Sequence, residues 1–173
     1  VNFPVPPEAV MPEPLQTIFL WVTFVASVGV LLWAASLGKR HGTFAPVLMV
    51  AGGFVAILME PLVTFLGHVI HPEEDQIMMF KTATRAIPWH IALGYTAVFG
   101  IVYMTLFRRI ASGNFDSRFI WKTILTTAVC EYLFESIPVS NGLWVYYDHQ
   151  PLWIWKGSAP IVWCILNASC ILM

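Results

Sequence analysis

Long apolar runs separated by short polar turns dominate the chain. They predict helices at residues 15–37, 44–70, 88–107, 119–137 and 159–173. A helix of about 20 predominantly apolar residues is long enough to cross a bilayer. The first four runs meet this length, whereas the last is shorter, and we interpret it as cut short. We therefore expect an all-α, polytopic transmembrane helix bundle with four full spans and a fifth, truncated span, in one domain (residues 1–173).

The composition agrees with an integral membrane protein whose main partner is the lipid bilayer. The chain is 58% apolar and 11% charged, and its mean hydropathy is +0.72. Soluble domains are about 45–50% apolar and about 25% charged. A net charge of −1 and the absence of a Lys/Arg cluster argue against a nucleic-acid partner. No cysteine pair has C-x-x-C spacing, so we interpret Cys130, Cys164 and Cys170 as packing residues.

Basic residues fall unevenly on the two sides of the predicted bundle. One side holds Lys39, Arg40, Arg108, Arg109, Arg118 and Lys122. The other side holds Lys81, Arg85 and Lys156, and the proline-rich lead before residue 15 has no basic residue. By the positive-inside rule the first group faces the cytoplasm. The N-terminus is therefore predicted to be non-cytoplasmic.

An acid lies inside the second predicted span. Glu60 is followed at once by Pro61 in the run MEPLVTFLGHVIHPEEDQ. Intramembrane acids usually face protein or water rather than lipid and mark functional sites. Proline cannot donate to the carbonyl four residues earlier. We therefore expect the helix to bend one turn before Glu60 and to leave the carbonyl of Ile57 as a free acceptor beside it.

The predicted topology brings further acids and imidazoles to the depth of Glu60. His68 and His71 end the second span, His90 begins the third, and Glu131 and Glu135 share one face of the fourth at spacing i, i+4. We expect a site near the non-cytoplasmic face whose catalytic residues are Glu60, His90, Glu131 and Glu135. Aromatic residues of the third span and of the loop 138–158 would bind the substrate: Trp89, Tyr95, Trp144, Tyr146, Tyr147 and Trp153.

Simpler interpretations of these residues stay open. Glu60, or the pair Glu131 and Glu135, could serve only as hydrogen-bond acceptors between helices. His90 could be an interfacial residue beside Trp89, because aromatic belts occur at that depth. His71 could be a solvated loop residue. Four tryptophans could be interface anchors rather than pocket walls: Trp144, Trp153, Trp155 and Trp163.

Three stretches resemble a family of bacterial multi-span membrane proteins, notably from actinobacteria, to which no function is assigned. They are MEPLVTFLGHVIHPEEDQ, RAIPWHIALGYTAVFG and ESIPVSNGLWVYYDHQPLWIWKGSAPIVWCILNAS. The resemblance covers residues 52–169. It implies a bacterial inner or plasma membrane and a fold with an acid in the second span. In span layout and in its intramembrane acid only, the chain is also similar to small integral-membrane terpene cyclases of meroterpenoid pathways. Neither resemblance assigns a catalytic residue.

Acid–base chemistry on a lipid-soluble, isoprenoid-like substrate is the first of three functional hypotheses. Protonating an alkene or an epoxide requires a carboxylic acid kept neutral in a dry site, which burial provides. Aromatic faces would stabilise a developing carbocation. Glu60 would be the acid, Glu131 or Glu135 its partner, and the loop 138–158 a lid.

The other two hypotheses use the same residues differently. A site for iron, zinc or copper would draw on Glu60, His68, His71, His90, Glu131 and Glu135. These residues lack the compact H-x-x-x-H or E-x-x-H spacing that such sites often show, and no other cofactor is indicated. Alternatively, the chain could be a non-catalytic subunit of a larger membrane assembly that handles lipid or protons.

Overall fold

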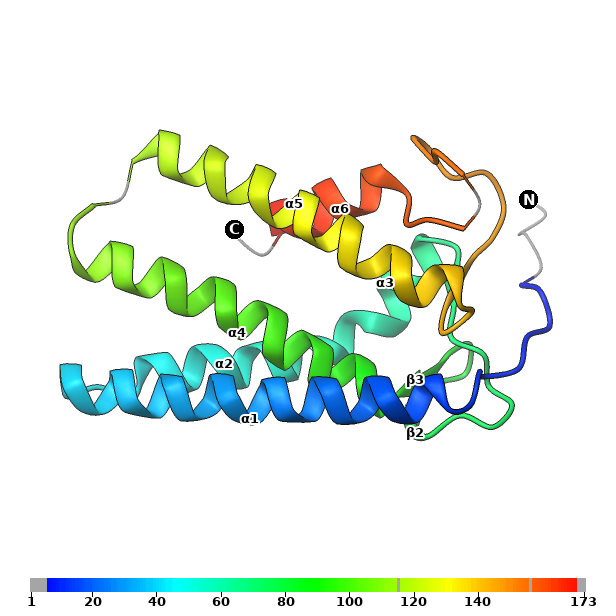
Figure 1. Ribbon diagram of the computed structural model, residues 1–173, viewed down its shortest axis with the longest axis horizontal. Coiled ribbons are helices and arrows are strands. Elements are labelled where there is room, and N and C mark those ends of the chain that lie inside the picture. The colour runs from blue at the N-terminus through cyan, green and yellow to red at the C-terminus, as the bar shows by residue number, and fades with distance from the viewer. Residues whose placement is uncertain (1–5, 115, 156, 171–173) are drawn as a thin grey trace. The chain divides into compact units, whose positions relative to one another are not determined.

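The chain is mostly helical and divides into two compact units. The computed structural model describes residues 6–114, 116–155 and 157–170 (Figure 1). One unit, Pro14–Glu60 with Pro88–Phe115, is called the three-helix unit below. The other, Val1–Glu13 with Pro61–Ile87 and Asp116–Met173, is called the mixed unit.

The three-helix unit is built from α1 (Leu15–His41), α2 (Ala45–Val55) and α4 (Trp89–Ala111), which pack pairwise along their lengths (Figure 1). Its core cluster contains Val30, Ala34, Leu37, Val50 and Met104. Across the α1–α4 contact, the Ser27 hydroxyl donates to the carbonyl of Leu93 at 2.7 Å. A hydroxyl that donates a hydrogen bond to the backbone of a neighbouring helix is a typical polar contact between helices in an apolar medium.

Two glycines let α4 approach its neighbours closely. A Cβ at Gly100 would collide with the side chain of Val30, and it would lie 3.3 Å from Val50. A Cβ at Gly53 of α2 would lie 3.1 Å from the Cβ of Phe99 and 3.2 Å from the carbonyl oxygen of Tyr95. Small residues at such points allow the close backbone packing on which helices in a bilayer depend.

The second predicted span changes its helical pitch before Pro61, and the predicted bend there stays a prediction. α2 passes into a 3₁₀ segment, η1 (Ala56–Met59), and then into α3 (Glu60–Leu66). The expectation of a free acceptor was wrong. The N–H of Glu60 donates to the carbonyl of Ile57, because the tighter i, i+3 pattern replaces the bond that proline cannot make.

The mixed unit combines helices with two short two-stranded ladders. α5 (Ser117–Ser140) packs against α6 (Ile161–Cys170). β1 (Val69–Ile70) pairs with β4 (Val145–Tyr146) in antiparallel register, and β2 (Met78–Lys81) pairs with β3 (Ala86–Pro88). The side chain of Asp116 caps α5 by accepting from the N–H of Phe119 at 2.7 Å.

Several predicted boundaries were wrong, and the all-α prediction holds only as a mostly helical chain. The second run ends its helix at Leu66 instead of residue 70, because His68 has a left-handed φ of 50° and the next two residues pair with β4. α5 continues past Pro138 to Ser140, since a proline in the last turn removes only one helical hydrogen bond. Of the predicted fifth helix, residues 171–173 lie outside the described residues.

Three helical segments within the described residues are long and apolar enough to cross a membrane. They are Leu15–His41, Ala45–Leu66 and Trp89–Ala111. This supports an integral membrane protein. α5 is not among them, because Lys122, Glu131 and Glu135 interrupt its apolar sequence, so the predicted count of four full spans is not confirmed.

Candidate functional site

Glu135 is the centre of a polar cluster in the mixed unit. Its Oε1 accepts hydrogen bonds from the Tyr146 hydroxyl and, at 3.3 Å, from Trp144 Nε1. The buried thiol of Cys164, on α6, lies 3.8 Å from Oε2. The tyrosine and the tryptophan come from the segment around β4, so Glu135 joins three parts of the unit. Two aromatic donors therefore meet at one oxygen of this carboxyl group.

Glu131 lies one helical turn before Glu135 and has a different environment. Asn167 of α6 donates from Nδ2 to Glu131 Oε1 at 2.5 Å. The other oxygen, Oε2, is buried and has no hydrogen-bond partner among the described residues. Two carboxyl groups on one helix face therefore differ in the number of donors around them. An inequality of this kind separates an acid from a base.

Tyr146 remains a hydrogen-bond donor because it does not ionise. Burial and the nearby carboxylate of Glu135 raise the pKa of Tyr146 well above its ordinary value. Its side chain is 8% exposed and stands on β4, whose pairing with β1 fixes its backbone. The phenol is therefore a permanent donor to Glu135.

A second group of polar and aromatic contacts holds the chain that follows β4. Arg85 Nη2 donates to the Tyr147 hydroxyl at 2.8 Å. The His68 ring stacks on Tyr147 at a centroid distance of 5.5 Å, and His68 Nδ1 lies 3.4 Å from Asp148 Oδ2. Gln150 Nε2 donates to the carbonyls of Gly67 and Tyr147 at 3.0 and 2.9 Å. These contacts tie the loop to the segment around β1.

His71 is buried rather than solvated, and it contacts the Glu135 cluster through an aromatic ring. Its exposed fraction is 4%, and its imidazole meets the Trp144 indole edge-on at a centroid distance of 6.1 Å. The interpretation of His71 as a surface loop residue was therefore wrong.

Glu60 belongs to the three-helix unit, where Tyr95 is a hydrogen-bond partner. Glu60 is 6% exposed, and the Tyr95 hydroxyl donates to its Oε2. His90 is 1% exposed and meets Phe19 of α1 edge-on at 6.2 Å, which places it inside the unit rather than at an interface with lipid. The predicted meeting of Glu60 and His90 with Glu131 and Glu135 stays a prediction.

Replacing Tyr95 by phenylalanine is expected to destabilise the three-helix unit by about 1–2 kcal/mol, because a buried carboxyl group loses a donor. The midpoint of thermal unfolding in detergent measures this loss. In a Glu60→Gln background the same replacement should cost less, since a neutral amide needs the donor less than a carboxylate does. An equal loss in both backgrounds would show that the hydrogen bond does not matter.

The remaining predicted binding residues have local roles. Trp89 begins α4 and is 39% exposed. Trp153 donates from Nε1 to the carbonyl of Ser158 at 2.7 Å, within its own loop. Trp163, which the sequence indicated as an interface anchor or a pocket wall, donates to Gln150 Oε1 at 2.9 Å.

The metal hypothesis gains no support from the described residues. Among them, no three His, Cys, Asp or Glu side chains form a group that could hold a metal ion. Of the six predicted ligands, Glu60 and His90 lie in the three-helix unit and the other four in the mixed unit.

Sequence reasoning missed two residues of the Glu135 cluster. The sequence indicated only a packing role for Cys164, and it did not single out Asn167. A lone amide in the last apolar run was a usable signal for Asn167, because a polar group in such a run needs a partner. Nothing in the sequence spacing predicts that the thiol of Cys164 lies beside the carboxylate of Glu135. No protein-family model, curated protein or solved structure matches the chain.

Proposed function

We propose that this membrane protein catalyses acid–base chemistry on a lipid-soluble, isoprenoid-like substrate at the carboxyl pair Glu131 and Glu135. The observation that carries the proposal is the unequal pair itself. Glu135 accepts from Tyr146 and Trp144, whereas Glu131 accepts from Asn167 and keeps one buried oxygen without a partner among the described residues. The cluster contains a proton donor, a proton acceptor and aromatic rings.

In the proposed reaction Glu131 is the general acid. A carboxyl group with a buried, unsatisfied oxygen is stabilised when it holds a proton, since the charged form would be costly there. Glu131 transfers this proton to a carbon of an alkene. Glu135, stabilised as a carboxylate by its donors, removes a different proton from the resulting cation. The substrate is isomerised or cyclised without a change in its composition or redox state.

Two features of the mixed unit suit a cationic intermediate and an apolar substrate. Trp144 and Tyr146 place aromatic rings beside the carboxylates, and aromatic faces attract positive charge. On the helix that carries the pair, Leu125, Val129 and Leu133 expose more than half of their side chains. An exposed apolar face of this kind suits contact with lipid, and we infer that α5 is a fourth membrane-embedded helix.

Solvent deuterium tests the proposal even while the exact substrate is unidentified. The purified full chain is incubated in D₂O with isoprenoid alkenes, and separately with a total lipid extract. Mass spectrometry then detects products of unchanged elemental composition that carry carbon-bound deuterium. The expected result is time-dependent, enzyme-dependent incorporation, because Glu131 exchanges its proton with solvent between turnovers.

Absence of any incorporation from both substrate sources would contradict the proposal. Isolation of the chain in a stable complex with other membrane proteins, with no incorporation by the complex either, would favour the assembly-subunit hypothesis instead. A product that lacks deuterium but has changed oxidation state would also contradict acid–base chemistry.

A further inference from the structure

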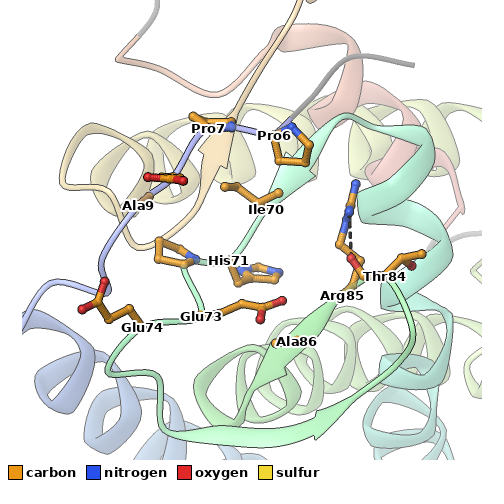
Figure 2. Close-up of a pocket in the computed structure, with 12 residues that line it drawn as sticks. Pro6, Pro7, Ala9, Ile70, His71, Glu73, Glu74, Thr84, Arg85 and Ala86 are labelled. Carbon is orange, nitrogen blue, oxygen red and sulfur yellow. Dashed lines mark hydrogen bonds between the residues drawn. The ribbon is translucent and has the colours of Figure 1, made fainter. Parts of the chain in front are cut away.

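A cavity in the mixed unit adjoins the Glu135 cluster, because His71 of its lining contacts Trp144. Its volume is about 320 Å³, within the range of small-molecule pockets. Three segments line it: residues 6–9 of the N-terminal lead, residues 70–74 after β1, and residues 84–86 at the start of β3 (Figure 2). The lead is held in place where the N–H of Met11 donates to the carbonyl of Glu74 at 3.0 Å.

Arg85 is a buried cation on this lining. It is 8% exposed, and its guanidinium donates to the carbonyl of Thr84 and to the hydroxyl of Tyr147, each at 2.8 Å. It also lies over the ring of Phe65, 5.6 Å from the centroid. These acceptors are neutral, Nε has no partner, and within the described chain no carboxylate pairs with Arg85. A buried charge without a counter-charge is costly.

Two hydrogen bonds to Thr82 hold the backbone of Arg85. The N–H of Thr82 donates to the carbonyl of Arg85 at 2.8 Å, and the N–H of Arg85 donates back to the Thr82 hydroxyl at 3.1 Å. Figure 2 shows Arg85 at one side of the lining, with His71 near its middle. The guanidinium and the imidazole are both groups that donate to carboxylates and phosphates.

The rim of the cavity carries the opposite charge. Glu8, Glu73 and Glu74 line it with exposed side chains. Lys81 neutralises Glu73 at 2.5 Å, which leaves Glu8 and Glu74 as the acidic part of the rim. Figure 2 shows Glu74 on the opposite side of the lining from Arg85. A ligand with only negative charge would be attracted by Arg85 and repelled by this rim.

We propose that the cavity binds a small zwitterion, with its phosphate or carboxylate on Arg85 and His71 and its ammonium group facing Glu8 and Glu74. The anionic group supplies the counter-charge that Arg85 lacks, and the planar guanidinium matches the paired oxygens of such groups. The ammonium group matches the exposed acids. This chemistry occurs both in the headgroup of an aminophospholipid and in free solutes such as phosphoethanolamine.

The soluble headgroup glycerophosphoethanolamine tests the proposal on the purified full chain by isothermal titration calorimetry. We expect saturable binding, with inorganic phosphate and ethanolamine each binding at least about tenfold more weakly, because each makes only half of the contacts. Arg85→Gln should weaken binding at least about tenfold, since a hydrogen bond to a charged group is lost. Glu8→Gln and Glu74→Gln should each weaken it about two- to fourfold.

Asp75→Asn is the matched control, because Asp75 is an exposed acid of the same loop that does not line the cavity. This variant should bind glycerophosphoethanolamine with the affinity of the unsubstituted chain. If Arg85→Gln does not fold, the affinities of Arg85→Lys and of the two rim variants still test the proposal. The two rim substitutions are at exposed positions. Phosphate binding as tight as the headgroup and insensitive to Glu8→Gln and Glu74→Gln would overturn the zwitterion.

Nanodiscs that contain phosphatidylethanolamine or phosphatidylglycerol identify the source of the ligand. Retention of phosphatidylethanolamine over phosphatidylglycerol after delipidation, lost in Arg85→Gln or Arg85→Lys, supports the proposal with a lipid as ligand. Binding of the soluble headgroup without selective lipid retention supports it with a free solute as ligand. If neither the soluble headgroup nor phosphatidylethanolamine binds, the proposal is overturned.

Discussion

Replacing Glu131 by glutamine is expected to lower deuterium incorporation into the lipid-soluble substrate by about 10²- to 10⁴-fold, the usual contribution of a positioned general acid. Glutamine keeps the shape of the side chain and an oxygen that can accept from Asn167. It carries no proton that it can transfer to a carbon. The rate is measured as carbon-bound deuterium per protein per unit time, at saturating substrate.

Three further variants and the thermal midpoint test whether the loss is specific to acid catalysis. Asp75→Asn, which removes an exposed acid outside the cluster, should keep the full rate. Glu135→Gln should lose a similar factor, and the double variant should lose little more than either single one, because the two groups act in one reaction. A Glu131→Gln protein with unchanged thermal midpoint and a rate within twofold of the parent would exclude Glu131 as the proton donor.

Replacing Gly100 by leucine is expected to destabilise the three-helix unit by about 3 kcal/mol, at the upper end of the usual cost of overpacking. A Cβ alone would already collide with Val30 of α1, and the remaining atoms would meet Val50 of α2. All three helices would have to separate to make room. The midpoint of thermal unfolding in detergent measures the loss.

Gly29→Leu is the matched control for this prediction. Gly29 also lies inside a helix that is apolar enough to span a membrane, but a Cβ there meets no atom within 4 Å. Because leucine is the better helix former, this variant should be neutral or stabilising. Equal losses at Gly29 and Gly100 would indicate a general effect of bulk rather than a close contact between helices.

The helices of this protein could be predicted from its apolar runs, whereas its strands could not. A run of apolar residues interrupted by turns needs no partner to be recognised, and Pro61 marked the change of pitch before Glu60. β1 and β4 are two residues long and exist because Val69 lies opposite Tyr146. Their pairing joins segments about 75 residues apart, and the register of such a pairing is set by packing rather than by local pattern.

The candidate site was partly predictable for the same reason. The spacing of Glu131 and Glu135 places them on one helix face. Of the predicted loop aromatics, Trp144 and Tyr146 contact Glu135, whereas Tyr147 and Trp153 have other partners. Asn167 and Cys164 reach the pair through the packing of α5 against α6, whose register the sequence does not encode locally. Arg85 was counted only as a charge for orientation, because nothing in the sequence tells a buried arginine from a solvated one.

The loop between α5 and α6 was expected to act as a lid, but its hydrogen bonds suit a fixed wall of the site. Its backbone pairs with β1, Gln150 bonds to Gly67 and Trp163, and Tyr147 bonds to Arg85. Opening it would break all of these bonds together, so its amide hydrogens at residues 145–147 should exchange among the slowest in the mixed unit. A lipid-soluble substrate would then reach Glu131 from the side, along α5, and the loop between α5 and α6 would not have to move.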